Sequence, residues 1–165
     1  MDLNQIMEEK AKENLVDIVV CEGWDERSLQ ASADLLKNNL SKITLLGNPE
    51  EINKKAEELG LDISKAKIVD FKNSELKAEL AEKLVEVRKH KSLTLEEANK
   101  LLEDENYFGC TYVLAGHGEA LVGSAICSTA TLMRPVLQIL RNKGTIVSDI
   151  GVLNDLKNDR MFLCS

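Results

Sequence analysis

The feature that most constrains the fold is a repeated alternation of short β-branched runs with longer segments of helical periodicity. The run VDIVVC at Val16–Cys21 is followed by a segment whose apolar residues recur at helical spacing, and this order then repeats. Strands separated by helices indicate an α/β fold of three layers, with a mainly parallel sheet and helices on both faces. The expected strands are Val16–Cys21, Lys42–Leu46, Ala66–Asp70 and Cys110–Ala115.

Several helix boundaries carry their own sequence signals. Gly47, Asn48 and Pro49 form a turn in which the proline opens the next helix, expected at Glu50–Leu59. Ser74 is placed to cap a long helix that ends near His90. Thr94, answered by Glu97 three residues later, forms a capping box that predicts a further helix.

A stretch of low charge runs from Gly116 to Leu140, in a chain of which charged residues make up 30%. It contains three glycines, the pair Ser128 and Thr129, and a single arginine, Arg134, before a helix-like run that ends at Leu140. A small-residue turn that leads into a helix N-terminus can bind an anion, because unpaired backbone N–H groups and the helix dipole both favour a phosphate. We therefore expect the chemistry of the chain to lie in this stretch.

Composition and charge argue against several classes of partner. The net charge of −7, the pI near 5.0 and the aromatic content of 4% are unlike a nucleic-acid-binding surface. The charged N-terminal segment lacks the apolar core of a secretory signal or a membrane span. The four cysteines lie far apart, and with only two histidines they do not suggest a metal site. We expect free thiols and a cytoplasmic location.

The pattern weakens after Leu140. Gly144 stands where a glycine would end the preceding helix, and Thr145 to Ser148 is strand-like. We expect a first α/β domain over residues 1–143. Residues 144–165 are expected to be the start of a second domain or a truncated tail.

Five short motifs, in a fixed order, resemble the N-terminal half of the phosphate acetyltransferase and butyryltransferase family. The resemblance spans nearly the whole chain, and it is the order of the motifs that makes it specific. The motifs are E-G-x-x-E-R at Glu22–Arg27, L-L-G-N-P at Leu45–Pro49, R-K-H-K at Arg88–Lys91, N-Y-F-G at Asn106–Gly109 and S-T-A-x-x-x-R-P-x-L-Q at Ser128–Gln138.

This resemblance implies an enzyme that moves an acetyl or short acyl group between coenzyme A and inorganic phosphate. The substrates would be acetyl-CoA and phosphate, with coenzyme A as a substrate and no separate cofactor, in a cytoplasmic homo-oligomer. The fold would be of the isocitrate/isopropylmalate dehydrogenase type, and incomplete. Arg88 and Arg134 would bind phosphate groups, because a guanidinium pairs bidentately with phosphate oxygens. Ser128 and Thr129 would donate hydrogen bonds to the same anion.

Two further features of the resemblance bear on activity. The catalytic serine, arginine and aspartate of the family belong to a C-terminal half that this sequence does not contain, so the catalytic residues remain unassigned. Turn residues also depart from the family pattern, as at Ala120, where a glycine is usual, and Thr131, where an aspartate is frequent. A truncated or degenerate form of the enzyme is therefore expected.

Each candidate residue also has a purely structural interpretation. In that interpretation Arg88 is a solvated cation at a helix C-terminus, and Ser128 with Thr129 is only a helix cap. Arg134 follows an apolar run, where a lone charge is costly without a partner, so a functional role is favoured there. The charged residues Glu22, Glu26 and Arg27 are interpreted as a local salt bridge that fixes a turn.

Other groups in and near the stretch are also given structural roles. His117 is interpreted as a surface residue, and Cys110 and Cys127 as packed thiols without a base partner. At the level of function, two alternatives to the acyltransferase stay open. One is a non-catalytic domain that binds coenzyme A or phosphate and needs a partner chain, and the other is an inert half-protein.

Overall fold

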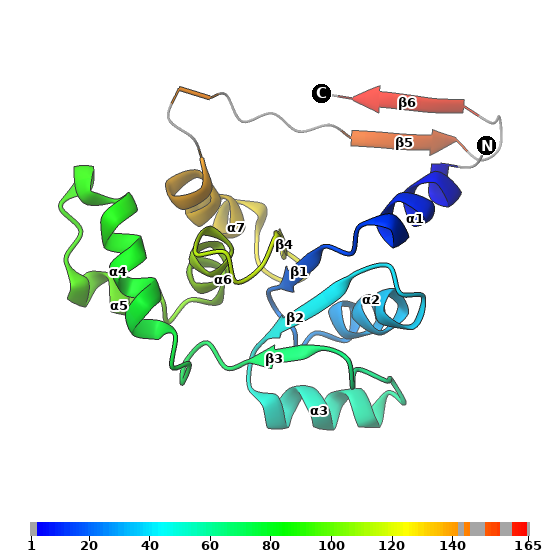
Figure 1. Cartoon of the computed structure of the whole chain (residues 1–165), viewed down its shortest axis with the longest axis horizontal. Helices are drawn as coiled ribbons and strands as arrows, with labels where there is room; N and C mark the ends of the chain where they lie inside the picture. Colours follow the sequence, from blue (N-terminus) through cyan, green and yellow to red (C-terminus); the bar gives the residue numbers. More distant parts are fainter. Residues whose placement is uncertain (1–2, 142–143, 146–150, 156–159, 165) are drawn as a thin grey trace.

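The computed structural model describes residues 3–141, 144–145, 151–155 and 160–164. Figure 1 shows the course of the chain from the N-terminal helix to the C-terminal hairpin. The elements are α1 (Leu3–Glu13), β1 (Asp17–Val20), α2 (Glu26–Lys37), β2 (Lys42–Leu46), α3 (Pro49–Glu58), β3 (Lys67–Val69), α4 (Lys77–Val87), the 3₁₀ turn η1 (Lys89–Lys91), α5 (Leu95–Leu101), α6 (Glu105–Leu114), β4 (Ala120–Val122), α7 (Thr129–Pro135), the π-helix η2 (Val136–Leu140), β5 (Gly151–Asp155) and β6 (Arg160–Cys164).

The central sheet has four parallel strands in the order β3-β2-β1-β4. β1 pairs with β2 on one side, where Asp17 aligns with Lys42, and with β4 on the other, where Ile18 aligns with Ala120. The first three strands confirm the sequence prediction and add to the sheet in one direction. The fourth returns to the opposite side of β1, so the order of the strands reverses at β1.

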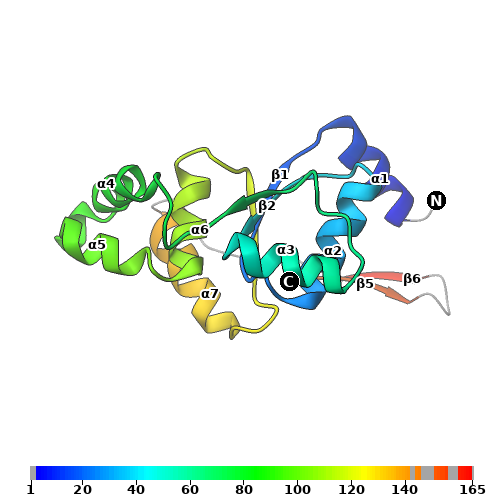
Figure 2. The ribbon, with the colours of Figure 1, turned by 90° about the horizontal axis from the view of Figure 1, so that it is seen from below.

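Helices cover both faces of this sheet, as predicted (Figure 2). Because side chains alternate along a strand, Val20 packs toward α2 and α3, whereas its neighbour Val19 packs toward α4, α5 and α6. The first face is closed by Leu29 of α2 and Ile52 of α3, and the second by a cluster that includes Phe108 of α6. The α/β fold with a parallel sheet is thus confirmed.

The prediction of a strand at Cys110–Ala115 is wrong, because this segment belongs to helix α6. Asp104 caps that helix by accepting hydrogen bonds from the N–H groups of Asn106 and Tyr107. Residues Phe108 to Tyr112 are all buried, so α6 shows little amphipathic periodicity. In the sequence, a short apolar run without such periodicity looks the same whether it forms a buried helix or a buried strand. The fourth strand lies instead at Ala120–Val122, within the stretch interpreted as a turn.

The other helix boundaries are confirmed or shifted by a few residues. The capping box of Thr94 and Glu97 is present at the start of α5. Ser74 does not cap α4 directly, because it accepts from the N–H of Leu76 in a turn that precedes the helix. The helical run that ends at Leu140 changes from α to π geometry after Pro135, which lacks the N–H that an α-helix would use there.

The C-terminal part of the described chain is an antiparallel hairpin of β5 and β6, which forms a sheet of its own. Thr145 is not in a strand, and residues 146–148 of the strand expected at Thr145–Ser148 lie outside the described residues. The division into residues 1–143 and 144–165 therefore stays a prediction. Within the described ranges, no helix is both long enough and apolar enough to cross a bilayer.

The turn after β1 depends on a glycine, which gives a first prediction. A Cβ at Gly23 would lie 2.8 Å from the carbonyl oxygen of Leu46 and 3.0 Å from the Cβ of Leu45, neither of which can rotate away. We expect Gly23→Ala to lower the free energy of unfolding by about 1–3 kcal/mol through this overpacking. Urea denaturation checks it through a lower midpoint at unchanged slope. An unchanged midpoint would contradict the close approach.

Candidate functional site

The reversal of strand order places a cavity at the carboxyl ends of β1 and β4. The chain leaves β1 for α2 on one face of the sheet and leaves β4 for α7 on the other, so the two connections separate here. Open α/β sheets bind their ligands at such a point. The cavity has a volume of about 290 Å³. It is lined by Cys21, Arg27, Ser28, Val122, Gly123, Ser124 and Ala125.

The two turns at this point are joined by the carboxylate of Glu22. Its Oε2 accepts from the backbone N–H of Ala125 at 2.6 Å and of Ile126 at 3.1 Å, and its Oε1 accepts from that of Cys127 at 2.6 Å. The residue is 1% exposed and has a left-handed backbone, with φ of 57°. The anion held by these three amides is therefore a side chain of the protein itself.

Burial and hydrogen bonding act in opposite directions on this carboxyl group. Burial alone would raise the pKa of Glu22, but hydrogen bonds from the N–H groups of residues 125–127 stabilise the ionised form, so its pKa is lowered. Glu105, at the start of α6, accepts from the N–H of Glu22 at 3.2 Å. The pKa of Glu105 is raised, because its burial outweighs that hydrogen bond. Of this pair, Glu22 is the carboxylate whose ionised form the site stabilises.

Arg27 binds the same loop from its carbonyl side. Its guanidinium donates to the carbonyl oxygen of Ala125 at 2.6 Å and pairs with Asp25, the N-cap of α2, at 3.1 Å. The interpretation of Glu22, Glu26 and Arg27 as one local salt bridge is therefore wrong in detail. Arg27 pairs with Asp25, Glu26 pairs with Lys55 of α3 at 3.8 Å, and Glu22 binds backbone amides.

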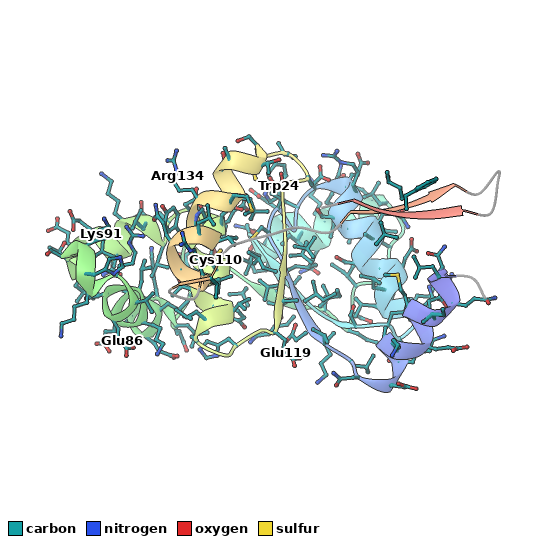
Figure 3. All side chains as sticks on the ribbon, turned by 90° about the horizontal axis from the view of Figure 1, so that it is seen from above. Trp24, Glu86, Lys91, Cys110, Glu119 and Arg134 are labelled. Atoms are coloured by element: carbon teal, nitrogen blue, oxygen red, sulfur yellow. The ribbon has the colours of Figure 1, made fainter. Side chains whose placement is uncertain are left out.

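Of the four predicted ligand-binding residues, three lie on α7. Ser128 is the N-cap, with its hydroxyl accepting from the N–H of Thr131 at 3.2 Å, and Thr129 is the first helical residue. Both are exposed. Arg134 is exposed too and projects outward (Figure 3). Its charge therefore bears no burial cost, so the expectation that Arg134 is a costly buried charge in need of a partner is wrong.

The fourth predicted residue, Arg88, lies elsewhere. It follows α4 and lines a separate cavity of about 640 Å³ together with Lys91, Arg141 and the η2 residues Leu137 and Gln138. Within the described part of the chain, its buried Nε has no hydrogen-bond partner. Ten residues of helix separate Ser128 from Gln138, a length of about 15 Å. The structure thus does not bring the four residues around one small anion.

The remaining candidates are not nucleophiles or bases of this site. His117 lies within 2.9 Å of Glu79 of α4 and packs against the ring of Tyr112, which gives it a structural contact. Burial raises the pKa of Cys127, with a further contribution from Glu22, and raises the pKa of Cys110 to about 12. Both thiols therefore stay protonated near neutral pH. Among the described residues no group of three or more His, Cys, Asp or Glu side chains could hold a metal ion.

Sequence reasoning underrated Glu22. Its signals were its place directly after a strand and its position at the start of the E-G-x-x-E-R motif, and a local salt bridge was the simpler interpretation. Its partners are backbone amides 103 to 105 residues away. Because a backbone N–H is not specific to one type of residue, the sequence does not show which residues supply these donors.

Comparison with known proteins gives a consistent result. The family model described as Phosphate acetyl/butaryl transferase matches residues 2–164. A phosphate acetyltransferase of Thermoanaerobacterium thermosaccharolyticum is 44% identical over 141 residues, covering 86% of this chain and 42% of that protein. One of Staphylococcus aureus is 37% identical over 162 residues, covering 98% and 49%. The chain thus spans about half the length of these curated relatives.

Solved structures agree with the sequence relatives. A phosphotransacetylase from Streptococcus pyogenes aligns with a TM-score of 0.88 at 33% identity, over 99% of this chain and 51% of that one. The EutD phosphotransacetylase from Staphylococcus aureus aligns with a TM-score of 0.84 at 36% identity, over 96% and 48%. These similarities confirm the resemblance inferred from the five motifs, whereas the comparison with a dehydrogenase fold stays a prediction.

The lowered pKa of Glu22 predicts how stability changes in acid. A carboxyl group with a lowered folded-state pKa stabilises the fold above its unfolded pKa of about 4.3, and this contribution is lost as the pH falls further. We expect Glu22→Gln to be less stable at pH 7 but to lose less stability than wild type below about pH 4.3. Urea denaturation at several pH values checks this, with Glu26→Gln as the exposed control. Parallel pH profiles for wild type and Glu22→Gln would refute the prediction.

Proposed function

Because the chain belongs to the phosphate acetyl/butaryl transferase family, we propose that it forms one wall of a site that transfers an acetyl or short acyl group between coenzyme A and inorganic phosphate. The family match over residues 2–164 carries this proposal. The cavity at the reversal of strand order supports it, because that is where an open α/β sheet places its ligand.

The chemistry requires several anionic groups to be bound at once. The thiolate of coenzyme A attacks the carbonyl of an acyl phosphate, so the site must hold the phosphates of both substrates and stabilise an oxyanion. The nucleophile belongs to coenzyme A, which agrees with the raised pKa values of Cys110 and Cys127. Coenzyme A is consumed as a substrate, and no separate cofactor is required.

The separation of the predicted residues suits a long ligand better than a single phosphate ion. Coenzyme A carries a diphosphate and a ribose phosphate that stand apart. Arg134, exposed on α7, and Ser128 with Thr129 at its start are accessible to one end of such a molecule. The cavity around Arg88 is basic, and a phosphate oxygen there would give the Nε of Arg88 the hydrogen-bond partner that it lacks among the described residues.

The setting of the protein is part of the same proposal. Cys21 and Cys110 are buried and free, as expected in a reducing cytoplasm. Acetyl-CoA and phosphate are the proposed substrates, and the protein is proposed to act as a homo-oligomer.

A binding experiment tests the two arginines. We expect Arg88→Ala and Arg134→Ala each to weaken coenzyme A binding about tenfold or more, because each removes charged hydrogen bonds to phosphate. Isothermal titration calorimetry measures the affinity. Lys54→Ala, on α3 at the opposite face of the sheet, is the control for loss of one positive charge and should leave it unchanged. Unchanged affinity in both arginine variants would count against these assignments.

An activity assay separates the proposed enzyme from a non-catalytic binding domain. We expect coenzyme-A-dependent release of phosphate from acetyl phosphate by the purified protein. The chain spans about half of its relatives, so binding without turnover would favour the domain that needs a partner chain. Absence of both binding and turnover would refute the proposed function.

A further inference from the structure

Glu22 combines three features that each disfavour a glutamate at its position. Its carboxylate is ionised but almost fully buried, which is costly unless hydrogen bonds replace water. Its backbone is left-handed, a conformation that residues with a Cβ rarely adopt. A second carboxylate, Glu105, lies close enough to accept from its backbone N–H. Strain of this kind persists where the surrounding structure fixes it, and it concentrates at functional sites.

The hydrogen bonds made by Glu22 fix one particular loop. They reach three successive N–H groups, those of residues 125–127, and Arg27 holds the Ala125 carbonyl on the other side of the same chain segment. Within the loop, Ser124 has a left-handed φ of 72° and its hydroxyl donates to the carbonyl of Cys127 at 2.9 Å. The loop leads directly into Ser128, the N-cap of α7.

We propose that Glu22 is a positioning residue of the ligand site, whose carboxylate fixes residues 125–127 and thereby sets where α7 begins and where Ser128 and Thr129 stand. The proposal rests on the proposed function, since it assigns these two residues to the coenzyme A and phosphate site. It also gives the three amides a resident anion. A ligand phosphate is thereby kept out of this turn and left to the residues of α7 and to Arg88.

The chemistry of the contact requires a carboxylate. All three partners are N–H donors, so both oxygens must accept. A glutamine would turn one N–H₂ group toward a backbone N–H, and neither group can accept. An aspartate keeps both acceptors on a shorter side chain and tolerates a left-handed backbone better. The Gln and Asp variants therefore separate charge and acceptor number from the mere presence of a side chain.

The experiment compares wild type, Glu22→Gln, Glu22→Asp and the control Glu26→Gln, whose carboxylate is exposed and pairs with Lys55. Amide hydrogen exchange is measured for residues 125–127 and, as a reference for folding, for the buried residues of α6. Calorimetry with coenzyme A gives the affinity of each protein. We expect Glu22→Gln to exchange about tenfold faster in the loop and to bind coenzyme A about tenfold more weakly, with α6 unchanged. Glu22→Asp should stay within about threefold of wild type, and Glu26→Gln should match it.

Two results would overturn the proposal. One is a folded Glu22→Gln protein whose loop exchanges as in wild type, and the other is faster loop exchange at unchanged coenzyme A affinity. If wild type itself does not bind coenzyme A, the proposed function fails, while loop exchange still decides whether Glu22 fixes the loop. If Glu22→Gln does not fold, Glu22→Asp decides instead. Because Glu22→Asp keeps both acceptor oxygens, loop exchange and affinity that both stay near wild-type values in this variant, or that change together, support the proposal. Faster loop exchange at unchanged affinity in Glu22→Asp overturns it.

Discussion

The geometry of the candidate site depends on one buried negative charge and the three backbone amides that solvate it. Without those amides, a carboxylate in the position of Glu22 would cost several kcal/mol, and the chain would have to protonate it or expose it. Because the donors belong to a single loop, the charge and the loop conformation are set together. That loop borders the cavity at the carboxyl ends of β1 and β4 and leads into the start of α7.

Most of the fold could be predicted from local sequence. The runs at β1, β2 and β3 are short, β-branched and bounded by turns, and the caps of α3 and α5 have clear signals in Asn48 with Pro49 and in Thr94 with Glu97. The sequence prediction failed where nearly complete burial removes the amphipathic periodicity of a helix. In α6 almost every side chain is covered, whereas β4 has only three residues, among glycines that resemble a turn.

The site was predictable only where a residue type carries its own chemistry. Ser128 as a helix cap follows from the sequence, and family motifs single out Arg88 and Arg134. Their spacing in three dimensions does not follow, because it depends on how η2 packs against the end of α4. The role of Glu22 was not predicted for a related reason. Its carboxylate accepts hydrogen bonds from the backbone amides of a distant turn, whereas its sequence neighbours suggest a local salt bridge.

The pairing of β1 with β4 has a consequence for how the chain folds. β1, β2 and β3 can assemble from neighbouring segments, but the two turns of the site are 103 residues apart at Glu22 and Ala125. Closing so long a loop carries an entropic cost that must be met before any contact between the turns forms, and such non-local pairing is intrinsically slow. The cavity is therefore expected to be among the last parts of the sheet to form. A synthesis intermediate that ends before β4 could already contain a three-stranded core, yet it would leave the Glu22 carboxylate in water.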